Sequence, residues 1–269
     1  MNAPDDLFLP DEQSAADSRH IAIQSVGVKS MTRPVRVATL QGPRPSVASI
    51  DMFVGLPAER KGTHMSRFVE VLQDYDEPLS MSGAKILLER MLERLDAQSG
   101  SIEMRMPFFV MKTAPISGAE SLMDYQLTFT AASDGKVTRF KQKVVVPVKS
   151  LCPCSKKVAD YGAHNQRSHI SITAELTGDI TVEEQIRIAE NASSCEIWAL
   201  LKRTDEKYVT ERAYNNPKFV EDVVRDIAIA LNKDTRVAAY TIEAENFESI
   251  HNHSAYARIE HGKAGAKLR

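Results

Sequence analysis

The sequence predicts an α+β fold made of two similar halves, each with helices laid across an antiparallel sheet. Two observations support this prediction. Segments with alternating apolar residues, typical of strands, are mixed with segments whose apolar residues recur every three or four positions, typical of helices. The dipeptide Asp134-Gly135 separates two β-rich runs, which indicates a hairpin and therefore antiparallel pairing. Such a mixture favours helices packed on a sheet, with an internal duplication.

In the first half, residues 1–46 are expected to form a flexible arm, because prolines and charges occur there without a clear period. Thr63 is expected to cap one helix, and Ser80 or Ser82 the next. The first unit, residues 47–150, is then predicted to contain a strand, two helices and three strands, at 47–56, 61–76, 78–97, 102–110, 125–129 and 140–148.

In the second unit, residues 151–269, Thr181 and Glu184 have the spacing of a capping box at a helix start. Asn216 is expected to cap a long helix that has Pro217 at its first position. The predicted order is a strand at 169–176, helices at 181–192, 194–202 and 217–231, and strands at 235–245 and 254–260.

The composition excludes several classes of protein. The chain has 269 residues, 43% of them hydrophobic, and a net charge of -2, which argues against a general nucleic-acid coat or a membrane binder. No apolar run is long enough to span a bilayer, and the first residues lack the pattern of a secretory signal. Three cysteines make no disulfide framework, so we expect a cytoplasmic protein with free or metal-bound thiols.

The stretch Ser150–His169, SLCPCSKKVADYGAHNQRSH, concentrates groups that bind metals. It holds Cys152, Cys154, His164 and His169, and thiols and imidazoles are ligands that divalent metals prefer. One turn between Cys152 and His164 could bring both to one ion. The alternative is a pair of small buried thiols followed by surface histidines.

Three further groups in the second half are candidates for chemistry. His251 and His253 are two residues apart, so on a strand they would face the same side, or simply form a polar strand end. Glu206 lies in a polar connection, where functional carboxylates are often found, although a single glutamate is more commonly a solvated charge.

Glu221 is placed near the start of the Pro217 helix, where the positive end of the helix favours an ionised carboxylate. Such a carboxylate could accept the paired N–H donors of a guanine edge. The alternative is a surface ion pair with Arg225 at the i,i+4 spacing.

Basic residues near these groups could neutralise a triphosphate, or could be ordinary surface charges. They are Lys61, Arg67, Lys156, Lys157, Arg167, Lys202, Arg203 and Arg212. The sequence has no glycine-rich phosphate loop and no G-x-S-x-G elbow. Two classes therefore remain: a metal-assisted hydrolase acting on a phosphorylated small molecule, and a non-enzymatic metal- or purine-binding module.

Four motifs resemble those of the prokaryotic type IB GTP cyclohydrolase I family, over residues 47 to the C-terminus. They are SLCPCSK, DYGAHNQRSH, KGTHMSRF and ESIHNHSAYA. The resemblance implies two tandem tunnelling-fold units, each an antiparallel sheet with helices on one face, with the second unit carrying most active-site residues. It also implies a homotetramer with active sites at subunit interfaces.

The same resemblance implies roles for individual residues. Cys152, His164, Glu206 and His251 match the metal-site positions, Glu221 the purine anchor, and Cys154 the cysteine that serves catalysis. The roles of Cys152 and Cys154 could be interchanged. His253 is a further candidate for proton transfer, and substrate contacts are expected from Lys61, His64, Arg67, Lys156 and Arg167.

The implied activity is the conversion of GTP and water to 7,8-dihydroneopterin triphosphate and formate, the entry step of folate synthesis. The implied cofactor is a divalent metal ion: zinc, manganese or iron. The alternatives are a related tunnelling-fold enzyme acting on another pterin or purine, or a non-catalytic binding module.

Overall fold

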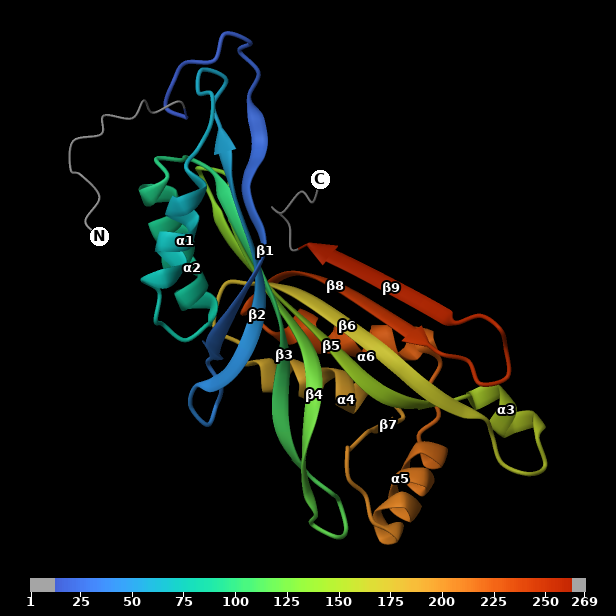
Figure 1. Cartoon of the computed structure of the whole chain (residues 1–269). Coiled ribbons are helices and arrows are strands. Elements are labelled where there is room, and N and C mark those ends of the chain that lie inside the picture. Colours follow the sequence, from blue (N-terminus) through green and yellow to red (C-terminus); the bar gives the residue numbers. More distant parts are fainter. Residues whose placement is uncertain (1–12, 263–269) are drawn as a thin grey trace.

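A computed structural model describes residues 13–262, which form a mixed α+β structure around one long antiparallel sheet (Figure 1). The sheet order is β1-β2-β3-β4-β5-β6-β8-β9, and the short β7 pairs with β5. The strands are β1 Ile23–Val37, β2 Arg44–Leu56, β3 Gly100–Thr113, β4 Glu120–Ser133, β5 Thr138–Leu151, β6 Asn165–Leu176, β7 Cys195–Glu196, β8 Val237–Asn246 and β9 Ala255–Gly262. The helices are α1 Met65–Gln73, α2 Met81–Arg94, α3 Pro153–Val158, α4 Val182–Ala192, α5 Arg203–Asn215 and α6 Val220–Lys233.

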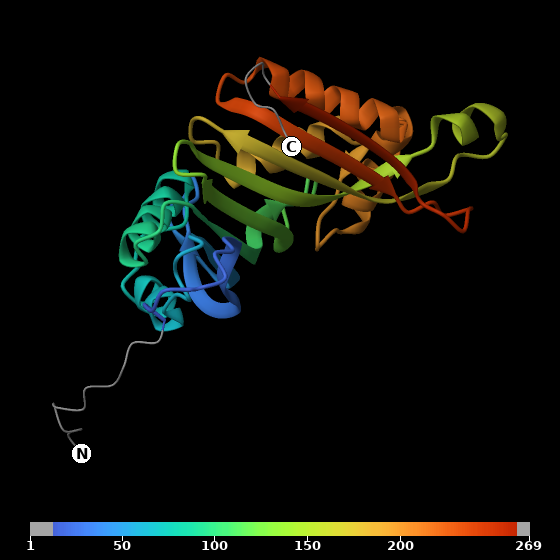
Figure 2. The same ribbon diagram turned by 90° about the horizontal axis from the view of Figure 1, so that it is seen from above.

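The strand register puts the buried residues of successive strands on one face of the sheet. Met104 pairs with Phe129, and Val144 pairs with Ile172, so apolar side chains line up across the strands. Helices α1 and α2 pack near β1–β5, whereas α4 and α6 pack near β5–β9 (Figure 2). The helices therefore cover the face that carries the buried residues, and residues of the opposite face are mostly half-exposed or exposed.

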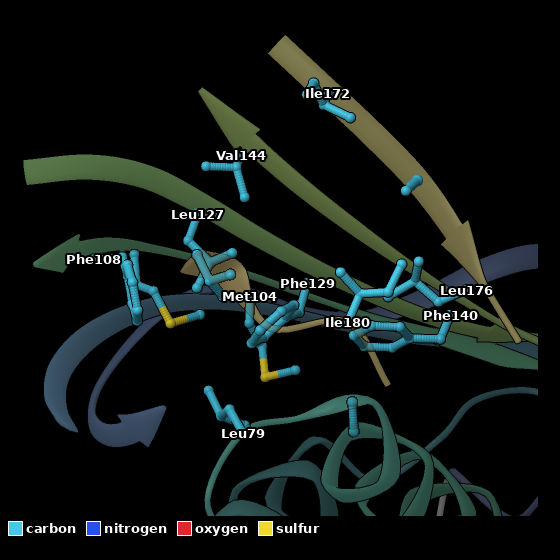
Figure 3. Close-up of a cluster of buried hydrophobic side chains, with 14 of the residues drawn as sticks. Leu79, Met104, Phe108, Leu127, Phe129, Phe140, Val144, Ile172, Leu176 and Ile180 are labelled. Carbon is cyan, nitrogen blue, oxygen red and sulfur yellow. The ribbon is translucent and has the colours of Figure 1, made fainter. Parts of the chain in front are cut away.

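One hydrophobic core runs through both halves of the chain. Figure 3 shows its central part, where side chains from β3–β6 meet those that lead into α2 and α4. The rings of Phe129 and Phe140 lie 5.4 Å apart between their centroids. The predicted boundary between residues 150 and 151 falls at the end of β5, and the sheet continues across it because β5 pairs with β6.

Two of the expected helix caps are present. The Ser80 side chain accepts a hydrogen bond from the Gly83 backbone, and Thr181 and Glu184 form the capping box before α4. Helix α1 is shorter than predicted, since its N-cap is His64 and not Thr63.

The prediction of a flexible arm over residues 1–46 is wrong for Ile23–Val37, which form the edge strand β1, and for residues 44–46, which begin β2. Residues 1–12 of that arm lie outside the described residues. Strand β1 shows no regular apolar alternation, because two irregularities in its register with β2 interrupt the pattern. Pro34 is tolerated there because an edge strand needs only one row of backbone hydrogen bonds.

Three predictions between residues 194 and 220 are wrong. The apolar segment 194–202 contains β7 and a loop instead of a helix, whereas the polar segment with Glu206 is helix α5. Asn216 follows the end of α5, and α6 begins only at Val220. The amide of Asn216 donates to the carbonyls of Ser193 and Ser194, so it ties two loops together rather than capping a helix start.

The short helix α3 follows β5 directly, in a stretch where only a turn was expected. Within residues 13–262, no helix has both the length and the apolar composition needed to cross a membrane.

Candidate active site

A cavity of about 310 Å³ lies where the ends of β5, β6 and β8 meet α3 and the start of α6. In Figure 1 this is the end of the sheet next to α3. The cavity collects residues from four separate parts of the sequence. Its lining comprises Cys152, Pro153, His164, Gln166, Lys218, Phe219, Val220, Glu221, Asn246, Glu248, His251, His253 and Ala255.

The backbone holds Cys152 and His164 side by side, as the sequence predicts. The Cys152 N–H donates to the His164 carbonyl at 3.2 Å, and the His164 N–H donates to the Ser155 hydroxyl at 3.2 Å. Cys152 is also the N-cap of α3, since its sulfur accepts from the Ser155 N–H at 3.4 Å. The thiol and the imidazole therefore enter the cavity from a rigid, mutually bonded pair of chain segments.

The His164 ring makes its polar contacts through Nδ1. That atom lies 3.1 Å from Oε1 of Gln166, 3.4 Å from the Ser249 hydroxyl and 3.9 Å from Oε2 of Glu248. The Gln166 amide nitrogen in turn donates to Oε1 of Glu248 at 3.3 Å. His164 and Glu248 each keep 13% of their side-chain area exposed, so the network sits at the wall of the cavity.

His251 and His253 both line the cavity, but they do so from the β8–β9 loop and not from a strand. Their rings stack with centroids 5.1 Å apart and an angle of 16° between their planes. The prediction that they face the same side agrees with this stacking, although its reason, strand alternation, is wrong.

Glu221 lies in the first turn of α6 and lines the same cavity as Cys152 and His164. The sequence also allowed an ion pair between Glu221 and Arg225. In the structure, the Arg225 guanidinium instead lies 3.9 Å from the Asp222 carboxylate. Asp222 also accepts a hydrogen bond from the Phe219 N–H at 3.0 Å, which fixes the start of α6. This turn therefore presents the Glu221 carboxylate from a defined helix end.

Three other predicted residues near this end of the sheet do not line the cavity. Cys154 is exposed in the first turn of α3. The Lys156 ammonium contacts the Tyr214 carbonyl and lies 4.2 Å from the centre of the Tyr214 ring. Arg167 is exposed and lies on the opposite face of β6 from Gln166.

His169 lies on the same face of β6 as Arg167 and stacks edge-on against Phe247, with centroids 4.9 Å apart. Burial lowers the pKa of His169, and the nearby Arg167 charge lowers it further.

The remaining predicted residues lie elsewhere in the chain. Glu206 is exposed in the first turn of α5 and lines a separate surface depression with Arg203, Lys207, Thr210 and Glu211. Lys61, His64 and Arg67 precede or begin α1, which lies at the opposite end of the molecule from α3 (Figures 1 and 2). One chain therefore brings together Cys152, His164, His251, His253 and Glu221, but not the other predicted residues.

The donor atoms of the cavity suit a divalent metal in type, since a thiol and imidazole nitrogens bind zinc, manganese or iron. Over residues 13–262, no three His, Cys, Asp or Glu side chains stand close enough together to hold an ion. Within the described residues, the cavity therefore holds metal-type donors, of which Cys152 and His164 are fixed by their backbone hydrogen bonds.

Sequence reasoning missed four polar residues of the cavity: Gln166, Lys218, Asn246 and Glu248. Gln166 could have been found from alternation, because it faces the same side of β6 as the buried Ser168. Beneath the cavity, the Ser168 hydroxyl donates to Oδ1 of Asn246 at 2.7 Å and lies 2.8 Å from the Ser150 hydroxyl. No local signal marks Glu248, which reaches the cavity only through the path of the β8–β9 loop.

A second cavity of about 310 Å³ lies between the β1–β2 turn and β3. Apolar residues such as Leu40, Phe109 and Leu122 dominate its lining, and none of its lining residues is a cysteine or histidine. Of these two cavities, the one at Cys152 and His164 is therefore the one that contains thiol and imidazole groups.

Comparisons with known proteins agree on one family. A family model described as type I GTP cyclohydrolase FolE2 matches residues 9–257. Proteins named GTP cyclohydrolase FolE2 from Cupriavidus pinatubonensis and Burkholderia vietnamiensis are each 58% identical to the chain. The alignments cover 96% of this chain and 95% of the first relative, and 98% of each for the second.

Solved structures with a similar fold are more distant in sequence. Uricase from Arthrobacter globiformis superposes with a TM-score of 0.54 at 7% identity, over 91% of this chain and 96% of that one. A hyperthermostable mutant of urate oxidase from Bacillus sp. TB-90 gives a TM-score of 0.51 at 9% identity, over 89% and 98%. These two likenesses concern the fold alone.

Proposed function

The chain belongs to the FolE2 family of type I GTP cyclohydrolases, and from this premise we propose that it converts GTP and water to 7,8-dihydroneopterin triphosphate and formate. This hydrolysis is the first step of tetrahydrofolate synthesis, and we assign the chain to the type IB subclass that its motifs resemble. We also propose that the chain consists of two tandem tunnelling-fold units, residues 47–150 and residues 151–269.

The observation that carries the proposal is the convergence of distant residues on one cavity. Cys152 and His164 supply metal-type donors there, while Glu221 supplies a carboxylate from the start of α6. A purine held by Glu221 would lie within the same cavity as the thiol and the imidazole. This combination favours a hydrolase acting on a purine nucleotide over a simple metal-binding module.

Glu221 is proposed to anchor the base. Its carboxylate would accept the N1 and N2 hydrogens of guanine, which orients C8 toward the metal-type donors. The reaction opens the imidazole ring of the base with water and releases C8 as formate. Proton transfers in these steps are assigned to Cys154 and His253, both of which lie at or beside the cavity.

We assign the metal-binding role to Cys152, His164, His251 and Glu206. A divalent ion bound there would supply Lewis-acid activation of water for the hydrolysis. Zinc, manganese and iron all suit a mixed set of thiolate, imidazole and carboxylate ligands. The three cysteines of the chain are free, which fits a reducing cytoplasm.

The position of Glu206 supports a site completed between subunits. Glu206 is exposed in the first turn of α5, whereas Tyr214, in the last turn of that helix, contacts Lys156 of α3. Glu206 and Tyr214 are eight positions apart on the helix, about 12 Å along its axis. We therefore propose that Glu206 reaches the cavity of a neighbouring subunit.

We propose that the triphosphate is contacted in the same way by residues at the far end of the molecule, together with two residues near α3. They are Lys61, His64 and Arg67, with Lys156 and Arg167. The open edges of the sheet, β1 and β9, support assembly, since edge strands offer unpaired backbone groups to another copy. The proposed assembly is a homotetramer.

The test is incubation of chelator-treated, metal-reloaded protein with GTP, read out as pterin fluorescence and as formate. Manganese, zinc and iron are compared at equal concentration. Stoichiometric formation of both products is expected with at least one metal. Metal-loaded protein that binds GTP but releases no formate would replace this function with a related activity on another purine or pterin.

A further inference from the structure

We propose that Gln166 is a positioning residue that holds His164 with its proton on Nδ1, leaving Nε2 free to bind a divalent metal. The inference rests on the proposed function only in that His164 is taken to be a metal ligand. It concerns the uncharged residue between His164 and Glu248, to which the sequence assigns no role.

The first step of the argument is the direction of the Gln166 amide. One end of this amide faces Oε1 of Glu248 at 3.3 Å and the other faces Nδ1 of His164 at 3.1 Å. A carboxylate has no proton to give, so it can only accept a hydrogen bond. The NH₂ group of Gln166 must therefore face Glu248, and the amide oxygen must face the imidazole.

The second step is the consequence for the imidazole. An amide oxygen accepts but cannot donate, so the ring nitrogen that faces it has to carry the proton. The His164 proton is thereby placed on Nδ1, and the lone pair of Nε2 is left for a metal. Glu248 acts through Gln166, because its Oε2 atom is 3.9 Å from Nδ1, beyond hydrogen-bonding distance.

The third step is that Gln166 is itself held in place. Only 8% of its surface is exposed, and it lies on β6, whose Leu151–Asn165 and Val148–Ser168 pairings with β5 fix the backbone on either side. The Ser249 hydroxyl, 3.4 Å from Nδ1, is compatible with the same tautomer because a hydroxyl can also accept. A fixed tautomer and ring orientation raise metal affinity, since neither has to be selected on binding.

A measurement on the unaltered protein tests the tautomer directly. The metal-free full-length protein, labelled with ¹⁵N-histidine, is studied by solid-state NMR at neutral pH, and the His164 signals are assigned from their loss in His164→Asn. Nitrogen shifts distinguish a proton on Nδ1 from one on Nε2. The proposal expects the Nδ1–H form, and an Nε2–H form in the unaltered protein would overturn it without any variant of Gln166.

Gln166→Leu removes both amide bonds at similar volume. We expect the His164 ring to lose its preference for Nδ1–H and the dissociation constant for Mn²⁺ or Zn²⁺, measured by competition with a chromophoric chelator, to rise about 10–100-fold. Gln166→Met is the second variant if leucine hinders folding, because methionine adapts to irregular sites.

The matched control is Gln142→Leu. Gln142 is also a buried glutamine on the covered face of the sheet, with its amide bonded to Gln185 at 2.8 Å and not to the cavity. This variant should lose stability yet keep the metal dissociation constant and the His164 tautomer. Equal loss of metal affinity in the Gln142 and Gln166 variants would reduce Gln166 to a structural role and overturn the proposal.

Turnover of GTP separates this inference from the proposed function. If the parent protein converts GTP but its Gln166→Leu variant keeps normal metal binding and the Nδ1–H tautomer, the inference about Gln166 is refuted and the function is not. If the parent protein fails to convert GTP, but shows the expected tautomer and its variant shows the expected loss of metal affinity, the function is refuted and the role of Gln166 is retained.

Discussion

Cys152 and Cys154 occupy different environments although a single residue separates them. Cys152 is half-buried, lines the cavity and caps α3 through its sulfur, whereas Cys154 is exposed and outside the cavity lining. A thiolate that binds a metal has to face the other ligands, so in the proposed function Cys152 is assigned to the metal and Cys154 to proton transfer.

A comparison of serine variants tests this assignment. Cys152→Ser keeps an atom that can cap α3 but replaces a soft ligand, so we expect most of the bound metal to be lost while the far-UV circular dichroism stays unchanged. Cys152→Ala should also lose metal. Cys154→Ser should keep metal and lose most GTP turnover. Metal analysis showing the reverse pattern for the two positions would interchange their roles.

Glu221 gives a second prediction at the level of one side chain. Two charge-assisted hydrogen bonds to guanine contribute roughly 1.5–3 kcal/mol each, so Glu221→Gln should lower kcat/KM for GTP by about 10²–10⁴-fold. Adenine lacks both donors, so the Glu221 carboxylate would be left without partners on the base and should reject ATP in the unaltered protein.

Asp222→Asn is the matched control for Glu221→Gln, because it removes one negative charge from the same turn of α6. Asp222 stabilises the helix start by accepting from Phe219, so its variant should have a lower Tm but nearly normal GTP kinetics. Wild-type kinetics in a folded, metal-loaded Glu221→Gln protein would leave the purine anchor unassigned.

At the scale of the elements, Asp205 fixes the first turn of α5 to the β3–β4 loop. It is fully buried and accepts from the backbone of Ile116, Ser117 and Lys202 at 2.8 Å each, and from the Ser117 hydroxyl at 2.6 Å. Burial by itself would raise the pKa of Asp205, but these hydrogen bonds outweigh burial and hold the pKa well below its usual range. Glu206 is the next residue, so the same contacts fix its position.

Asp205→Asn should therefore lower the Tm at neutral pH, by roughly 5 °C or more, because one amide cannot accept all four hydrogen bonds. A depressed pKa contributes stability above the unfolded value of about 3.9 and loses that contribution as the pH falls below it. The Tm difference between the two proteins should accordingly shrink below about pH 4. Thermal scans from pH 7 to pH 3 measure it, with the exposed Asp124→Asn as control; a constant difference would contradict the assignment.

The elements that were predictable are those whose signal is local. The spacing of Thr181 and Glu184 predicts the start of a helix. The dipeptide Asp134-Gly135 predicts the β4–β5 hairpin, because these residues favour a tight turn. Strand β1 was missed because its pairing with β2 is interrupted by irregularities and its exposed side is polar. Strand β1 forms because it pairs with β2, and the periodicity of its own residues does not indicate this pairing.

The predictions for the segment between Ser194 and Val220 were wrong for a related reason. Cys195 is buried because α5 packs over it in a small separate cluster, so apolar composition there reflects tertiary burial and not a helix. Conversely, α5 looks polar because few of its residues are buried. Cys152, His164 and His251 could be predicted for the cavity from motifs, and Glu221 from its place near a helix start. Gln166 and Glu248 enter the cavity through strand pairing and the path of a loop.

At the scale of the whole molecule, the sheet is continuous but its two edges remain open. Strand β5 joins the halves through β6, and one core extends on both sides of that junction. The described chain leaves β1 and β9 as edges. Helix α1, which Lys61 precedes and which contains Arg67, lies at one end, and α3, next to the Cys152 cavity, lies at the other (Figure 1). Assembly of several copies can therefore bring the two ends together at shared sites.

Subunit complementation tests the shared site in the assembled protein. Cys152→Ala and Glu206→Gln should each abolish turnover when expressed alone, because each removes a proposed metal ligand from every site. Co-expressed with different affinity tags and purified for both, the two variants form mixed assemblies. If each site takes Cys152 from one subunit and Glu206 from its neighbour, random assembly of the two chains regenerates about a quarter of the sites.

The mixed assembly should then show about a quarter of the unaltered turnover per site, and metal should be recovered in proportion. If both residues act within one chain, every site keeps one defect and the mixture stays inactive. A mixture of Cys152→Ala with His164→Asn is the control, since the backbone hydrogen bond between those residues places them in one chain, and it should remain inactive. Activity in that control would point to exchange between sites rather than to Glu206 crossing the interface.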